Sequence, residues 1–97
     1  MNHKLLNCIG FQWDEANFEK NWISHQVSST ECEQIFFNQP LLLGDDEQHS
    51  KKEERYHVLG QTNEGRQIFL VCTVRNEFIR VISARDMNKL ERKEYDE

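Results

Sequence analysis

Three consecutive runs in the second half of the chain have the composition of strands. These runs are ERYHVLGQT, RQIFLVCTVR and FIRVISAR, and the links between them, Asn63-Glu64-Gly65 and Asn76-Glu77, have the length of hairpin turns. The middle run is apolar on both faces, which is typical of a central strand covered on both sides. The pattern therefore predicts an antiparallel meander of three strands.

Two helices are predicted in the first half, behind a short strand over residues 9–13. The first helix begins at Asp14, a good cap, and ends near His25. The second begins at the serine pair 28–29 and cannot continue through Pro40, the only proline. Their expected apolar positions are Phe18, Trp22 and Ile23 in the first helix, and Cys32, Ile35 and Phe36 in the second.

The end of the chain, DMNKLERKEYDE, predicts a third helix. Asp86 is expected to cap it, and its mixed charges at i,i+4 spacing indicate a face in contact with solvent. Its expected apolar anchors are Met87, Leu90 and Tyr95.

Two segments lack a regular pattern. Residues 1–8 are expected to form a loose leader, and the charged stretch over 44–53 is expected to be a flexible loop. The elements together predict one domain over residues 1–97 with an α+β fold. Its small antiparallel sheet has about four strands, packed with two N-terminal helices and one C-terminal helix.

Composition narrows the classes of function. The net charge of −5 means that RNA binding would need a local cationic patch. No apolar run has the roughly 18 residues of a membrane span. Three cysteines without a CxxC pair support neither disulfides nor zinc, and are expected as buried residues in a reducing cytoplasm. The spacing of His25, His49 and His57 does not indicate a metal site.

Several short motifs, in order and at consistent spacing, resemble those of the BrnT toxins of bacterial type II toxin–antitoxin systems. The resemblance covers nearly everything from Phe11 to Tyr95. The motifs that carry it are F-x-W-D-E-A at 11–16, Asn21, His25-x-Val27-Ser28, E-E-R-Y at 53–56, Gly60, a G-R-x-apolar hairpin at 65–70, IRVISAR at 79–85 and ERKEY at 91–95.

This resemblance implies a small RelE-like fold and a ribonuclease activity that needs no metal and no other cofactor. It also implies a cognate antitoxin, with a ribbon-helix-helix DNA-binding domain, that blocks the toxin. The complex would contact operator DNA only through the antitoxin. Family members commonly read Lys-His-Gly-Val where this chain has Ser24, His25, Gln26 and Val27, and commonly carry a basic residue at the position of Asn17.

Metal-free RNA cleavage needs a base for the ribose 2′-hydroxyl, an acid for the leaving 5′-oxygen, and cations for the charged transition state. His25 suits either proton-transfer role, because imidazole titrates near neutral pH; the alternative is a histidine that only ends its helix. Glu54 is a second candidate base and Arg55 a candidate phosphate clamp. The alternative for this pair is an exposed strand edge with a surface ion pair.

Arginine side chains in the last strand are the candidate cations. Arg85 is expected to stabilise transition-state charge; the alternative is a structural link to the last helix through Asp86 or Glu94. Strict alternation places Arg80 on the opposite face, where it would bind substrate or form a buried salt bridge.

Two residues of the last helix complete the candidate site. Lys89 and Tyr95 are assigned to substrate binding, against the alternatives of a solvated helix face and an anchor on the core. His49 and His57 receive no role.

Two functional hypotheses follow. The first is a cytoplasmic endoribonuclease toxin that inhibits translation and is neutralised by its antitoxin. The second is a catalytically weakened module of the toxin fold that docks an antitoxin in an operon repressor complex, with Leu41–Leu43 and the second helix facing the partner. A solitary structural domain is a third alternative.

Overall fold

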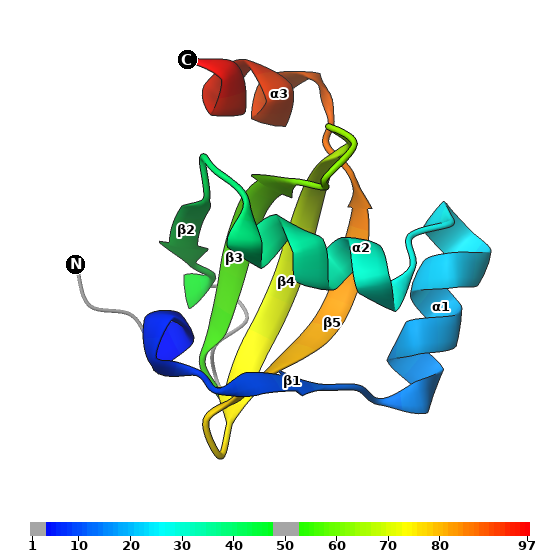
Figure 1. The fold of residues 1–97 in the computed structure, drawn as a ribbon, viewed down its shortest axis with the longest axis vertical. Coiled ribbons are helices and arrows are strands. Elements are labelled where there is room, and N and C mark those ends of the chain that lie inside the picture. Colours follow the sequence, from blue (N-terminus) through cyan, green and yellow to red (C-terminus); the bar gives the residue numbers. More distant parts are fainter. Residues whose placement is uncertain (1–3, 48–52) are drawn as a thin grey trace.

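Five strands in the order β1-β5-β4-β3-β2 form one mixed sheet in the computed structural model, which describes residues 4–47 and 53–97 (Figure 1). The predicted α+β class and the meander are confirmed, but the sheet has a fifth strand, and β1 runs parallel to β5. A four-residue run such as β2 shows too little alternation to be recognised in advance. The strands are β1 (Gly10–Gln12), β2 (Leu42–Asp45), β3 (Arg55–Gln61), β4 (Gln67–Arg75) and β5 (Phe78–Asp86).

The helices begin where side chains can cap their first turns. Asp14 accepts a hydrogen bond from the Ala16 N–H at 2.8 Å, as its predicted role as a cap requires. Ser28, one of the two serines predicted to cap the second helix, forms a capping box with Glu31. Asn88, and not Asp86, caps the last helix, because Asp86 still belongs to β5. The helices are α1 (Glu15–His25), α2 (Ser29–Gln34) and α3 (Lys89–Asp96), with 3-10 turns η1 (Lys4–Asn7) and η2 (Ile35–Phe37).

The main core lies between the sheet and the segment formed by α2 and η2, which crosses one face (Figure 1). Cys32 and Ile35 are buried there against the side chains of the central strands. Gly60 permits the close approach, since a Cβ atom at this position would lie 2.9 Å from the Ile35 Cβ. The sheet residues buried on this face are Tyr56, Val58, Ile68, Leu70, Cys72, Ile79, Val81 and Ala84.

A bulge in β5 reverses the expected alternation. The ladder pairs Val81 with Cys72 but Ser83 with Val71, which leaves Ile82 without a partner. Because of this extra residue, the side chains after Ile82 point to the opposite face from the one that strict alternation predicts. Arg80 and Arg85 therefore lie on the same face of the sheet. The prediction of one arginine on each face was therefore wrong.

The first helix is rotated relative to the prediction. Phe18, Trp22 and Ile23 are 40%, 54% and 76% exposed, whereas Asn21 is buried. The reason lies at the edge of β5, because β1 pairs with this strand only as far as Arg80. Beyond that point the Asn21 side-chain oxygen accepts a hydrogen bond from the Ala84 N–H at 3.1 Å, so α1 closes this part of the edge (Figure 1).

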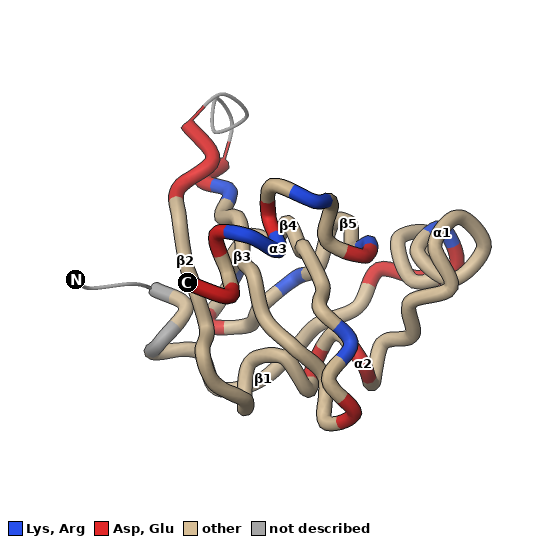
Figure 2. Tube along the Cα trace, turned by 90° about the horizontal axis from the view of Figure 1, so that it is seen from above, with Lys and Arg blue, Asp and Glu red and all other residues tan. Residues whose placement is uncertain are grey.

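A second, smaller core lies under α3, a helix with charges of both signs along its length (Figure 2). Met87 and Tyr95 are buried as predicted, but Leu90 is 77% exposed. The Tyr95 hydroxyl donates a hydrogen bond to the Pro40 carbonyl at 2.6 Å. Helix α3 thereby covers one end of the sheet face opposite α2, next to Leu59.

The segments expected to be irregular are partly built into the fold. Leu5, within η1, is buried in the main core, so the predicted loose leader is wrong for the part that the structure describes. Gly44 and Asp45 belong to β2, and Asp46 is buried, so the predicted loop begins later than residue 44. Residues 1–3 and 48–52, including His49, lie outside the described residues.

Candidate active site

The sheet face opposite α2 carries three rows of side chains that run across the strands. Residues directly opposite one another in a ladder share a face, so the register defines each row. The rows are Arg55, Thr73 and Arg80; His57, Val71 and Ser83; and Leu59, Phe69 and Arg85. Helix α3 packs on the third row, while the first lies at the other end of the strands.

Arg85 is held from two directions. Its Nη1 donates to Glu91 Oε1 at 2.8 Å and its Nη2 to Glu91 Oε2 at 2.9 Å, while Nη1 also contacts the Asp86 carbonyl at 3.0 Å. The guanidinium carbon lies 4.2 Å from the centre of the Phe69 ring. Arg85 therefore ties β5 to α3, through Glu91 instead of the expected Asp86 or Glu94 side chains. Arg85 donates three hydrogen bonds to the described residues. Since a guanidinium has five N–H donors, two remain for a ligand.

His25 and Arg85 line the same open cleft of about 410 Å³. The cleft lies where the C-terminal end of α1 meets the end of β5, and Ile23 and Asp86 also line it. Tertiary structure thus joins two candidates that lie 60 residues apart in the sequence (85 − 25). A histidine and an arginine that line one open cleft can offer a proton-transfer group and a cation to the same ligand.

Arg66 fixes the backbone that carries His25. Its Nη2 donates to the His25 carbonyl at 3.1 Å and its Nη1 to the Gln26 carbonyl at 2.9 Å. The same guanidinium binds Asp86 at 2.7 Å and Glu31 at 3.1 Å. Sequence reasoning gave Arg66 no role, although it belongs to the G-R motif at 65–66.

These ion pairs shift the pKa values of all three groups. The hydrogen bond from Arg66 lowers the pKa of Asp86. Burial raises the pKa of Glu31, but hydrogen bonds from the Ser28 N–H and from Arg66 outweigh it, so the net shift is downward. The hydrogen bond with Asp86 raises the pKa of Arg66 in turn. The cluster is therefore fully ionised at neutral pH.

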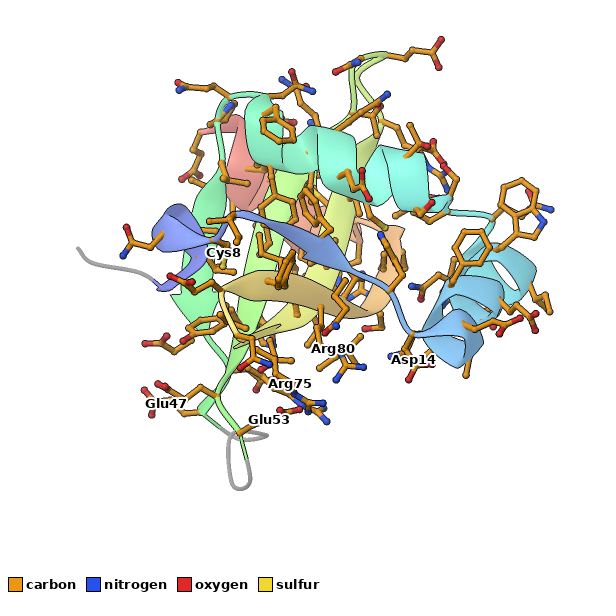
Figure 3. The ribbon with its side chains drawn as sticks, turned by 60° about the horizontal axis from the view of Figure 1, so that its bottom comes forward. Cys8, Asp14, Glu47, Glu53, Arg75 and Arg80 are labelled. Carbon is orange, nitrogen blue, oxygen red and sulfur yellow. The ribbon has the colours of Figure 1, made fainter. Side chains whose placement is uncertain are left out.

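Arg55 and Arg80 form the cationic end of the face. They stand two strands apart in one row, which places their Cα atoms about 10 Å from each other. Arg80 is close to Asp14, with 3.8 Å between Nη2 and Oδ2 (Figure 3). Its Nε is buried and has no hydrogen-bond acceptor among the described residues. A buried donor of this kind needs an acceptor, such as a water molecule or a bound ligand.

His57 belongs to the middle row, although the sequence analysis gave it no role. Its Nε2 lies 3.1 Å from Oδ2 of the buried Asp46, and its ring centre lies 5.1 Å from that of Phe69. A carboxylate that orients an imidazole is a common feature of acid–base sites. The signal was hidden in the sequence because Asp46 stands in a run of charged loop residues and becomes buried only beside β3.

The remaining candidates lie apart from the cleft that His25 and Arg85 share. Glu54 is exposed just before β3, and its carbonyl accepts a hydrogen bond from the Thr73 hydroxyl at 2.7 Å. Lys89 is exposed in the first turn of α3. Tyr95 is buried under the same helix, as the anchor on the core that was the alternative to its predicted contact with substrate.

Other chemistries find little support in the described residues. In residues 4–47 and 53–97, no group of three or more histidine, cysteine, aspartate and glutamate side chains is arranged to hold a metal ion. Burial raises the pKa values of the Cys32 and Cys72 thiols to about 12, so neither is a nucleophile at neutral pH. No helix in this part of the chain has the length and apolar character needed to cross a membrane.

Comparisons with known proteins identify the family and the fold of the chain. Residues 13–91 match the family model described as the ribonuclease toxin BrnT of type II toxin–antitoxin systems. The crystal structure of the Brucella abortus ribonuclease toxin BrnT superposes with a TM-score of 0.62 and 18% sequence identity, covering 84% of this chain and 99% of that one. No curated protein matches the chain. Since the family model spans most of the sequence, the chain belongs to the BrnT family of ribonuclease toxins.

Proposed function

We propose that this protein is a metal-independent endoribonuclease that cleaves RNA by attack of a ribose 2′-hydroxyl on the adjacent phosphorus. A base removes the hydroxyl proton, the 2′-oxygen bonds to phosphorus, and the bond to the 5′-oxygen breaks. An acid then protonates that leaving oxygen, and the products end in a 2′,3′-cyclic phosphate and a 5′-hydroxyl. No metal takes part in these steps. The base takes up one proton and the acid gives up one, so the protons balance.

The observation that carries the proposal is the bulge at Ile82. It brings Arg80 and Arg85 to one face of the sheet, and Arg85 opens into the cleft that His25 lines. We assign Arg85 to the transition-state charge and His25 to proton transfer at the same phosphate. Arg85 is well suited to this part, since Phe69 and Glu91 hold its guanidinium in place before substrate arrives.

The row of Arg55 and Arg80 is assigned to the RNA backbone beyond the scissile phosphate. Arg80 and Arg85 lie five positions apart along β5, so their Cα atoms are separated by about 15 Å. This span is too long for one phosphate group, so the two ends of the face bind different phosphates. This cationic face is the local patch that an acidic protein requires in order to bind RNA.

The partner proposed with this activity is a cognate antitoxin with a ribbon-helix-helix domain. That domain, and not the toxin, would contact operator DNA. The type II description of the family supports an antitoxin partner.

A single-turnover cleavage assay tests the activity. A single-stranded RNA is incubated with the purified protein in EDTA, beside the same RNA with 2′-O-methyl groups. We expect cleavage of the first RNA with cyclic phosphate ends, and none of the second. The proposal fails if the RNA stays intact at an excess of protein, or if EDTA abolishes cleavage.

Matched variants separate the chemical role of Arg85 from its structural role. Arg85→Gln removes the charge and is expected to slow cleavage by at least about 100-fold. Glu91→Gln keeps Arg85 and the cap of α3 but weakens the ion pair, and is expected to retain most of the activity. Equal losses in the two variants would show that Arg85 acts only by holding α3.

A second function is favoured by the state of Arg85 and of the helix end. Glu91 engages both Nη atoms of Arg85, and the positions on either side of His25 carry Ser24 and Gln26 in place of the family's usual residues. These features fit a toxin-fold module that binds an antitoxin without cleaving RNA. The cleavage assay decides between the two, because this module would bind the antitoxin and leave RNA intact.

A further inference from the structure

Helix α1 carries exposed apolar and aromatic residues. Phe18 and Trp22 stand one turn apart on this helix and Ile23 follows them, and all three are exposed. The Trp13 ring packs edge-on against Phe18 with ring centres 6.2 Å apart, so the aromatic surface extends beyond the helix. We call the surface formed by Phe18, Trp22 and Ile23 the α1 face.

The orientation of α1 is built into the fold. Asn21 holds the opposite side of the helix against the edge of β5 through its hydrogen bond with Ala84, and the Asp14 cap fixes where the helix begins. A helix in a protein with no partner would turn its apolar stripe toward the core. Here Asn21 is the buried residue of the helix, whereas Phe18, Trp22 and Ile23 are exposed among charged residues, which is the arrangement of an interaction surface.

The α1 face continues into the candidate active site. Ile23 belongs to the face and also lines the cleft of His25 and Arg85. A partner that covers Ile23 therefore reaches the mouth of this cleft. Binding at α1 and blocking of the site are joined in one surface.

Charges along α1 indicate the chemistry of the occupant. Glu15 and Glu19 are exposed on the helix, and Lys20 is its only cation (Figure 2). Asp14 adds a partly exposed carboxylate at the N-terminal end. These carboxylates, which we call the acidic rim, repel phosphate groups and attract lysine and arginine side chains. The acidic rim therefore points to a protein with basic side chains and not to RNA.

We propose that the α1 face is the docking surface of the antitoxin, and that the segment which docks is an amphipathic helix with basic flanks. Apolar residues of this segment at i, i+3 and i+4 spacing pack on Phe18 and Trp22, and its lysine or arginine side chains pair with Glu15 and Glu19. Its end covers Ile23 and closes the cleft. The inference rests on the proposed function in one respect, namely that the partner of the toxin is an antitoxin.

The binding experiment uses the protein encoded next to the toxin gene as the probe. The toxin is the full chain, either unchanged or with Phe18→Ser and Trp22→Ser together. The matched control carries Phe37→Ser and Leu90→Ser, two residues that are 79% and 77% exposed on other elements. We expect the α1 variant to lose at least about 100-fold in affinity, and the control to bind like the unchanged chain.

Two further readouts keep the outcomes distinct. In a Trp13→Phe background Trp22 is the only tryptophan, and its emission should shift to the blue when the antitoxin binds. The Phe18→Ser, Trp22→Ser variant should still cleave RNA but should no longer be inhibited by the antitoxin. If the unchanged chain does not cleave RNA, the proposed function is contradicted but the docking proposal is not, because the affinity for the antitoxin is measured separately.

Three results would overturn the docking proposal. The first is unchanged antitoxin affinity in the α1 variant. The second is an equal loss of affinity in the Phe37→Ser, Leu90→Ser control. The third is a chain that dimerises by itself through Trp22, with the variant monomeric and its antitoxin affinity intact, because the occupant would then be a second copy of this chain.

Discussion

Replacing Arg66 by methionine should destabilise the protein and weaken the site together. Methionine keeps the unbranched stem but removes every N–H donor. Arg66 joins the carbonyls at the end of α1, Glu31 in the first turn of α2 and Asp86 at the end of β5. The change therefore releases four groups that come from three separate elements.

The size of the effect follows from the burial of the ion pairs. The side chains of Arg66 and Glu31 are 28% and 29% exposed, so their pair lies between a surface salt bridge and a buried one. Surface pairs contribute about 0–1 kcal/mol, and breaking a buried pair costs about 3–5 kcal/mol. The freed carbonyls of His25 and Gln26 can be hydrated, which moderates the loss. We expect a decrease of about 2–3 kcal/mol in the free energy of unfolding, or roughly 10–20 °C in Tm for a domain of this size.

Thermal unfolding followed by circular dichroism measures this change, and Arg75→Met is the matched control. Arg75 makes one ion pair, with Glu53 at 3.0 Å, and its side chain is 50% exposed. Its loss should change Tm little. If Arg66→Met lowers Tm no more than the control does, the reasoning that Arg66 links the three elements is refuted. RNA cleavage below the Tm of the variant should also fall, because His25 loses the contact that places its backbone.

Two further outcomes are expected from the same region. Gln26 has φ 54° and ψ 40°, a left-handed conformation that favours glycine, so Gln26→Gly should raise stability by about 0.5–1 kcal/mol; an unchanged or lower Tm would contradict this. Arg66 lowers the folded-state pKa of Asp86; for Glu31, burial raises the pKa, but hydrogen bonds from the Ser28 N–H and from Arg66 outweigh this effect. The stability that both carboxylates contribute is therefore complete above their ordinary pKa values and is lost as pH falls through the lowered ones. Urea unfolding from pH 6 downward should show a stability loss that begins near pH 4 and is smaller in Arg66→Met; an equal loss in both proteins would exclude this cause.

Local elements could be predicted because their signals lie within a few residues. Asp14 and Ser28 cap their helices as expected, since a cap and its first turn are neighbours in the chain. Strands β3, β4 and β5 coincide with the three runs predicted as strands, because the composition of a strand and its turn residues are also local signals. Asp86 was assigned to the wrong element because a strand end and a helix cap use the same residue types, and Asn88 stood two positions further on.

The arrangement of the site could not be predicted in this way. A bulge at Ile82 depends on how β4 and β5 pair, and no residue within β5 announces the inserted position. His57 gained a partner only when the fold buried Asp46 beside it. The exposure of Phe18, Trp22 and Ile23 was not predicted. It depends on the hydrogen bond between Asn21 and the Ala84 N–H, which lies 63 residues away in the sequence.

The sequence by itself determined the three helices, four of the five strands that the structure describes, the α+β class and the family, through capping residues, alternation and motifs in a consistent order. Tertiary structure decided which arginines share a face, which residues of α1 meet solvent and which histidine lines the same cleft as Arg85. The physical reason is one of range. Capping and alternation are satisfied within a single turn or strand, whereas edge closure, strand register and ion-pair networks are satisfied only between segments that are distant in the chain.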